Sequence, residues 1–118
     1  MDVRKEVIKK LTDENLIYYF KEDEDWEVRE AVVKKLSDEK LIFDTFKDDE
    51  FWDVRLAVVN KLSDENLIYY FKEDADWKVR EAVIEKLSDE KLIFDTFKDD
   101  EDCDVREAVV ERLSDENI

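Results

Sequence analysis

The sequence DEDWEVREAVVKKLSDEKL (residues 23–41) contains one apolar stripe between two helix-start signals. Val28, Ala31, Val32 and Leu36 are spaced at i, i+3, i+4 and i+8, which places them on one face of an α-helix. We therefore predict a first helix over residues 26–36. A strand is a weaker interpretation, because Lys, Glu and Leu favour helix and the apolar residues do not alternate.

A second short helix is predicted to follow, starting at Ser37-Asp38-Glu39 and ending at Lys47. The serine hydroxyl is the predicted N-cap, and the two acids then face the positive end of the helix. In the acidic loops that lead to the next first helix, the predicted caps are Asp25, Asp76 and Asp102. The same start signal recurs at Thr12-Asp13-Glu14, Ser63-Asp64-Glu65, Ser88-Asp89-Glu90 and Ser114-Asp115-Glu116.

The whole chain repeats this pattern. A Val-Arg pair occurs at Val3-Arg4, Val28-Arg29, Val54-Arg55, Val79-Arg80 and Val105-Arg106. Two unit types alternate and differ in the second half, which reads LIYYF in one and LIFDTF in the other. The predicted units are residues 1–25, 26–51, 52–76 and 77–102, with a partial unit at 103–118.

One such helix pair cannot bury its own apolar face, so neighbouring units must stack. We predict an all-α fold, an α-solenoid of about 4.5 two-helix repeats of 25–26 residues, built as a 51-residue double repeat within one domain, 1–118. Neither end of the array carries a polar cap. Either the chain is a fragment of a longer array, or its ends pair with other copies, so a homo-oligomer through the ends is a further expectation.

Composition excludes several functions. Without histidine or glycine, the chain has no imidazole base, no His-ligated metal and no Gly-rich phosphate loop. A net charge of −16 disfavours nucleic acid and anionic membranes as partners. One cysteine and no long apolar run or signal peptide favour a cytoplasmic protein. We expect no enzyme activity, no cofactor and no metal.

The motif D-x-D-W-x-V-R-x-A-V-x-x-x-L-S-D-x-x-L, from Asp23 to Leu41, resembles the HEAT-like repeats, in particular the short variety of phycobilisome-lyase-type proteins and the leucine-rich repeat variant. The units are shorter than standard HEAT units of roughly 40–47 residues, and the family's turn prolines are absent. In the leucine-rich repeat variant the second helix is a 3₁₀ helix, although DENLIYYF is long enough for two α-turns. The resemblance implies a scaffold fold and little about function.

HEAT-type repeats commonly place an Asp six residues before an Arg, and the two residues form a ladder between neighbouring units. A catalytic pair would occur once, whereas this pair recurs, so a structural ladder is the preferred interpretation. The resemblance implies the pairs Asp23/Arg29, Asp49/Arg55, Asp74/Arg80 and Asp100/Arg106.

Two other features have structural interpretations. The acidic loops suggest a calcium site, but an EF-hand needs a glycine that this chain lacks.

Trp26, Trp52 and Trp77 share one repeat position with Met1 and Cys103. We expect this stripe to pack at the junctions between units and Cys103 to be a thiol at the edge of the core; an exposed ligand platform is the alternative.

The positions that vary between units lie on one face of the first helix, which is expected to be exposed. They include Lys5/Glu30/Leu56/Glu81/Glu107 and Lys9/Lys34/Asn60/Glu85/Glu111. Drift on an unconstrained surface explains this variation, and a partner-binding face is the alternative. The candidate partner patch is Phe51, Trp52 and Leu56, where apolar side chains gather in the third unit.

The resulting prediction is a non-enzymatic repeat scaffold that mediates protein–protein interaction. Alternatives are an acidic inhibitor that mimics nucleic acid, a subunit that assists an enzyme as the bilin-lyase relatives do, and an engineered or consensus repeat array. Lysines between the acidic columns weigh against the mimic, and abundant Lys, Asn, Ile, Phe and Tyr weigh against a designed array.

Overall fold

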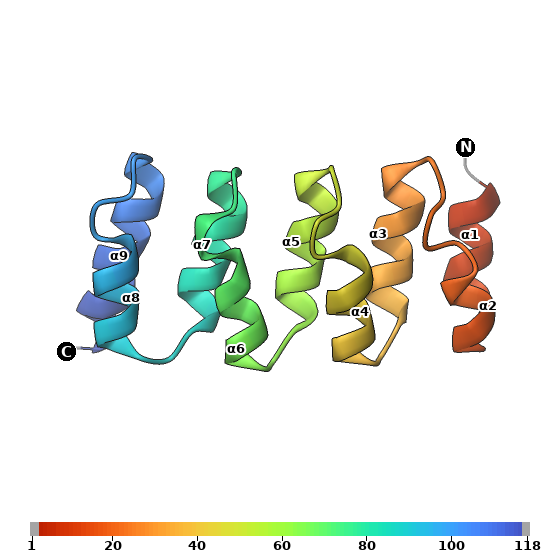
Figure 1. Cartoon of the computed structure of the whole chain (residues 1–118), viewed down its shortest axis with the longest axis horizontal. Helices are drawn as coiled ribbons and strands as arrows, with labels where there is room; N and C mark the ends of the chain where they lie inside the picture. Colours follow the sequence, from red (N-terminus) through yellow and green to blue (C-terminus); the bar gives the residue numbers. More distant parts are fainter. Residues whose placement is uncertain (1–2, 117–118) are drawn as a thin grey trace. The chain divides into compact units, whose positions relative to one another are not determined.

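The computed structural model describes the backbone of residues 3–116 and the side chains of residues 3–114 (Figure 1). Over this range the chain is all-helical and contains no strand. It divides into two compact parts, residues 1–61 and 62–118, which we call the N-terminal part and the C-terminal part. The all-α prediction is therefore confirmed.

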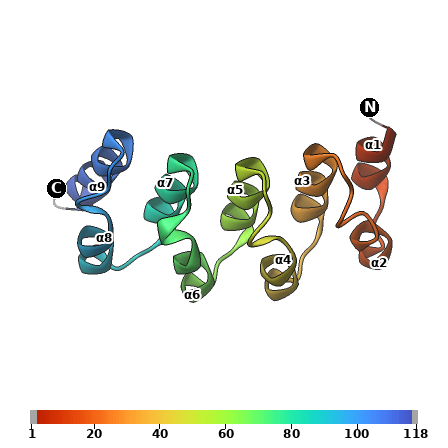
Figure 2. The same ribbon diagram turned by 45° about the horizontal axis from the view of Figure 1, so that its top comes forward.

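In the N-terminal part the first helices pack in a row, with α3 between α1 and α5. The second helices lie along one side of that row, and α2 contacts α3 while α4 contacts α5 (Figure 2). The helices are α1 (Val3–Lys10), α2 (Glu14–Tyr18), α3 (Trp26–Lys35), α4 (Glu39–Phe46) and α5 (Trp52–Lys61).

The C-terminal part repeats this plan. Helix α7 packs against α9, α8 also contacts α9, and η1 contacts α7. The elements are α6 (Glu65–Ile68), the 3₁₀ helix η1 (Tyr69–Glu73), α7 (Trp77–Lys86), α8 (Glu90–Phe97) and α9 (Cys103–Glu116).

The apolar stripe of each internal first helix forms the core. Val28, Ala31, Val32 and Leu36 of the predicted stripe are buried, as is Val33 of α3, and the corresponding residues of the α5 and α7 repeats are buried as well. Ile42 and Phe46 of α4 are also buried, whereas Thr45 of the same helix is half-buried. Helix α3 ends one residue before its predicted limit, at Lys35.

The helix caps differ from the prediction in one respect. The N-cap of α4 is Asp38, whose carboxylate accepts the Leu41 N–H three residues later, and Asp89 caps α8 in the same way. Asp13 and Asp64 cap α2 and α6 by accepting the N–H two residues later. Each second helix starts one residue later than expected, so the predicted serine cap is wrong. Asp25 and Asp76 cap α3 and α7 as predicted, and Asp102 accepts the Asp104 N–H at the start of α9.

The serine before two of these caps links its repeat to the previous one. Ser37 donates its hydroxyl (2.6 Å) and its backbone N–H (3.1 Å) to the Glu14 carboxylate. These two hydrogen bonds lower the pKa of Glu14 below its usual range, because they stabilise the ionised form. Ser88 makes the same contact with Glu65.

The LIYYF segment of one repeat contacts the LIFDTF segment of the next. The Tyr18 hydroxyl of one type bonds the Thr45 hydroxyl of the other at 3.2 Å, and Tyr69 and Thr96 do the same. The types also differ in helix length. LIFDTF forms two-turn α-helices in α4 and α8, whereas LIYYF forms the shorter α2 and α6, and η1 continues α6 as a 3₁₀ helix.

The predicted start of a second helix at Ser114 is wrong. Helix α9 runs without a break from Cys103 to Glu116. In the internal repeats, by contrast, the backbone turns to an extended conformation at Leu36 and Leu87 before the serine. Ser-Asp-Glu is compatible with a continuing helix, and in those repeats the break accompanies the serine–glutamate contact and the packing of a second helix.

Candidate functional site

The four ladder aspartates start the turns that precede the first helices. In each, the carboxylate accepts the backbone N–H two residues later, at 2.9–3.0 Å. This turn orients the carboxylate, and at Asp49 and Asp100 the oxygen that accepts the backbone N–H also accepts from an arginine, as does the other oxygen. The aspartates are Asp23, Asp49, Asp74 and Asp100.

The arginines connect neighbouring repeats. Arg29 on α3 donates from Nε (2.8 Å) and Nη2 (3.1 Å) to both carboxylate oxygens of Asp49, a bidentate pair with both side chains at most 10% exposed. Its Nη1 donates to the Asp23 carbonyl at 2.7 Å. The hydrogen bond to the Asp49 carboxylate raises the pKa of Arg29, and this effect outweighs burial, which acts to lower it. Arg80 pairs with Asp100 in the same way.

The pairs six residues apart are joined through the aspartate backbone and not through its carboxylate. Arg29, Arg55, Arg80 and Arg106 each donate Nη1 to the carbonyl of the aspartate six residues earlier. The carboxylates of Asp49 and Asp100 face arginines twenty residues earlier. Arg4, which the sequence interpretation left out of the ladder, pairs with Asp23 at 3.0 Å, and its place in the first Val-Arg pair was the signal for it.

The candidate partner patch is partly engaged within the molecule. Phe51 stacks on Trp26 with ring centroids 6.1 Å apart, and the Arg29 guanidinium lies 5.6 Å from the Phe51 ring. Phe51 therefore covers the buried Arg29–Asp49 pair while remaining 37% exposed. Trp52 and Leu56 are half-buried.

The tryptophan position is half-buried at Trp26, Trp52 and Trp77, but Cys103 is exposed, so the prediction of a core-edge thiol is wrong. α9 begins at Cys103, in a turn where its thiol and the carboxylates of Asp102 and Asp104 lie within 4.8 Å of one another. The Asp102 carboxylate already accepts the Asp104 N–H, so the start of α9 accounts for this cluster of a thiol and two carboxylates.

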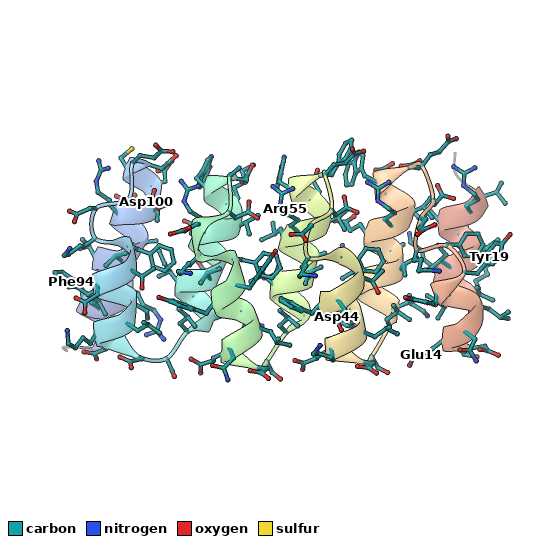
Figure 3. The ribbon with its side chains drawn as sticks, viewed as in Figure 1. Glu14, Tyr19, Asp44, Arg55, Phe94 and Asp100 are labelled. Atoms are coloured by element: carbon teal, nitrogen blue, oxygen red, sulfur yellow. The ribbon has the colours of Figure 1, made fainter. Side chains whose placement is uncertain are left out.

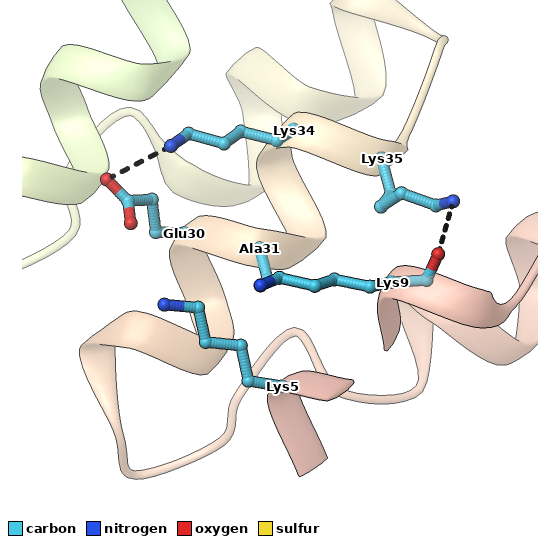
Figure 4. Close-up of a pocket in the computed structure, with 6 residues that line it drawn as sticks. All are labelled: Lys5, Lys9, Glu30, Ala31, Lys34 and Lys35. Atoms are coloured by element: carbon cyan, nitrogen blue, oxygen red, sulfur yellow. Dashed lines mark hydrogen bonds and ion pairs between the residues drawn. The ribbon is translucent and has the colours of Figure 1, made fainter. Parts of the chain in front are cut away.

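The variable face of the first helices forms a basic groove between α1 and α3 (Figure 4). Its volume is about 230 Å³, and four lysines and one glutamate surround the buried Ala31. Lys35 donates to the Lys9 carbonyl at 3.1 Å, and Lys34 pairs with Glu30 at 3.7 Å. The lining residues are Lys5, Lys9, Glu30, Ala31, Lys34 and Lys35.

The same positions form an acidic groove between α7 and α9. Its volume is about 160 Å³, and Glu81, Glu85 and Glu111 surround the buried Ala108 with a single cation, Arg112. Arg112 donates to the Leu87 carbonyl at 2.7 Å, as Lys35 does to Lys9. The two grooves share an alanine floor and a cation that donates to a backbone carbonyl at or just after the end of the preceding first helix, and their other charges are opposite.

Glu81 is a carboxylate of the acidic groove whose pKa is raised. Partial burial, followed by the nearby charges of Glu85, Asp104, Glu111 and Asp102, raises the pKa of Glu81. A positively charged side chain placed in this groove would remove the repulsion. The sequence interpretation identified these variable positions but not the charge contrast, because the grooves form only when two first helices pack together.

We expect Glu81→Gln to increase the free energy of unfolding by about 0.5 kcal/mol at pH 7, because it removes a like-charge pair with Glu85 one helical turn away. As the pH falls through the raised pKa of Glu81, the folded parent takes up a proton, so the gain from the substitution shrinks. Urea unfolding at pH 7 and pH 5 measures both effects. Glu90→Gln, the same change at an exposed site on α8 with no acidic residue three or four positions away, is the control; an equal gain there would contradict the repulsion.

We compared the chain with protein-family models, curated proteins and solved structures, and none of them matched. Across residues 3–116, every helix is too short or too polar to span a lipid bilayer. The HEAT-like resemblance therefore rests on the repeated residues of the chain alone.

Proposed function

We propose that this chain is a non-enzymatic HEAT-like α-solenoid that binds protein partners through the exposed face of its first helices. The observation that supports this most is the pair of grooves at equivalent positions. Their floors are the same residue type, and their rims carry opposite charge. Such a surface keeps one architecture while it presents different charges to different ligands.

The basic groove is the more specific of the two sites, because it lies on a chain of net charge −16. Long-range attraction on such a chain favours cations everywhere, so cation binding to the acidic groove carries little selectivity. An anionic segment, by contrast, is repelled by most of the surface and attracted only where lysines cluster. We infer that the basic groove selects an acidic peptide segment of a partner protein.

The lysines of the basic groove differ in the interactions that they already make within the chain. Lys35 is engaged with a helix carbonyl, and Lys34 and Lys9 form exposed ion pairs with Glu30 and Glu6. Exposed pairs of this kind contribute about 0–1 kcal/mol, so a carboxylate of a ligand can replace them at little cost. Lys5, Lys9 and Lys34 are therefore the residues that would contact the ligand. A nucleic-acid mimic would need an unbroken acidic surface, and this groove does not fit that alternative.

The test is the binding of a fluorescently labelled octaglutamate peptide, measured by anisotropy at low salt. We expect weak binding that declines as salt increases, because exposed charges are screened. Lys5→Glu with Lys9→Glu should weaken it at least about tenfold, which corresponds to about 1.4 kcal/mol.

The matched control reverses two lysines outside the groove, Lys40 and Lys47, and changes the net charge by the same amount. Equal weakening by the two double variants would mean that net charge alone governs binding. Absence of binding by the parent chain at low salt would also rule out the basic groove as a site for acidic segments.

A further inference from the structure

The outer side of α1 exposes apolar residues that are buried in every later repeat. Val3 is 74% exposed and Val7 is also exposed. Their counterparts on α3 are Val28 and Val32, which are buried, and those on α5, α7 and α9 are buried as well. The exposure of Val3 and Val7 therefore reflects what lies beside α1 and not the residue type.

Helix α9 shows the opposite pattern. Val105 and Val109, the counterparts of Val3 and Val7, are buried, but Val110 is 62% exposed. The counterparts of Val110 are Ile8, Val33, Val59 and Ile84, all of them fully buried.

Together, these two patterns show which neighbouring repeat covers the Val3 position and which covers the Ile8 position. In the N-terminal part α1 packs against α3, and this contact leaves Val3 exposed while Ile8 is buried. In the C-terminal part α9 packs against α7, and this contact buries Val105 and leaves Val110 exposed. The Val3 position is therefore covered by the preceding repeat, and the Ile8 position by the following one.

The second helices extend both surfaces. Leu16 on α2 is exposed, whereas its counterparts Leu41 and Leu92 are half-buried. Phe94 on α8 is exposed, whereas its counterpart Phe43 on α4 is buried (Figure 3). The stacked positions are those of the first helices, so we call Val3 and Val7 the leading face and Val110 the trailing face.

We propose that copies of this chain stack head to tail, with the trailing face of one copy packed on the leading face of the next. The internal junction between α1 and α3 is the template, because it joins the same two positions, Ile8 on one side and Val28 with Val32 on the other. A contact between two different faces leaves one of each free, so the assembly grows as an open stack. This proposal does not depend on ligand binding in the grooves.

Salt distinguishes this association from one made by charges. Each copy carries a net charge of −16, so copies repel one another at low salt. Screening reduces that repulsion and leaves apolar burial in place, so stacking strengthens as salt is added. Pairing of a basic groove with an acidic groove would weaken under the same change.

The experiment is sedimentation equilibrium of the whole chain over roughly 10 μM to 1 mM, at low salt and in about 0.5 M NaCl. We expect the average mass to rise with concentration, and more strongly at high salt. Val110→Glu blocks the trailing face, and Val3→Glu with Val7→Glu blocks the leading face, so each variant alone should remain monomeric. Asn66→Glu, which adds one charge at an exposed site on α6, should associate like the parent.

The sharpest test is an equal mixture of the two blocked variants. Each supplies the face that the other lacks, so the mixture should form dimers and stop there. A parent chain that stays monomeric throughout overturns the proposal. A mixture that stays monomeric, or leading-face variants that still associate on their own, also overturns it. Far-UV circular dichroism and urea midpoints show that each variant is folded.

Discussion

Asp49→Asn is expected to lower the free energy of unfolding by about 3 kcal/mol, because it leaves the guanidinium of Arg29 buried without its carboxylate. Asparagine keeps the oxygen that accepts the Phe51 N–H, so the turn survives and the loss reports the ion pair. Arg29→Gln should cost a similar amount. Urea unfolding followed by circular dichroism measures both.

The matched control is the pair between Arg4 and Asp23, which has the same chemistry at the surface. Arg4 is 48% exposed, so Arg4→Gln should cost at most about 1 kcal/mol. Similar losses for Arg4→Gln and Arg29→Gln would show that burial does not set the strength of the ladder.

A double-mutant cycle identifies which arginine pairs with the Asp49 carboxylate. Arg29→Gln combined with Asp49→Asn should cost less than the sum of the single changes, because neither charge is then left alone. A cycle between Asp49→Asn and Arg55→Gln should show much weaker coupling, since Arg55 contacts the Asp49 carbonyl, which asparagine retains. The reverse order of coupling would contradict the geometry described above.

Val33→Glu should lower the free energy of unfolding by about 4 kcal/mol or more and unfold the N-terminal part, because it places a carboxylate in a fully buried position. Val110→Glu is the same substitution at the same repeat position, but this side chain is exposed, and it should change stability by about 0.5 kcal/mol or less. Urea midpoints of the purified variants measure the difference.

Comparable destabilisation by the two glutamates would mean that the outer side of α9 is as tightly packed as the inside of α3. It would also remove the basis for the head-to-tail stack, since Val110→Glu must remain folded to block the trailing face. The comparison therefore tests the packing on which that proposal rests.

Local sequence was sufficient to predict the secondary structure closely. The spacing of Val28, Val32 and Leu36 identified α3 to within one residue, and Asp25 was correctly predicted as its cap. Both features depend on residues within a few positions of each other, which the periodicity of a helix brings together. The predicted cap of α4 failed by a single position, Ser37 instead of Asp38, because either side chain is suitable and tertiary contacts selected between them.

The sequence alone thus determined most of the helices, their repetition and all the residues of the ladder except Arg4. The tertiary structure decided which groups those residues contact, because the partners come from another repeat. Asp49 faces Arg29 and not the nearer Arg55 through its carboxylate, since one packed helix pair brings residues twenty positions apart together. Val33 and Val110 occupy the same place in the repeat, and only the packing around α3 and α9 makes one buried and the other exposed.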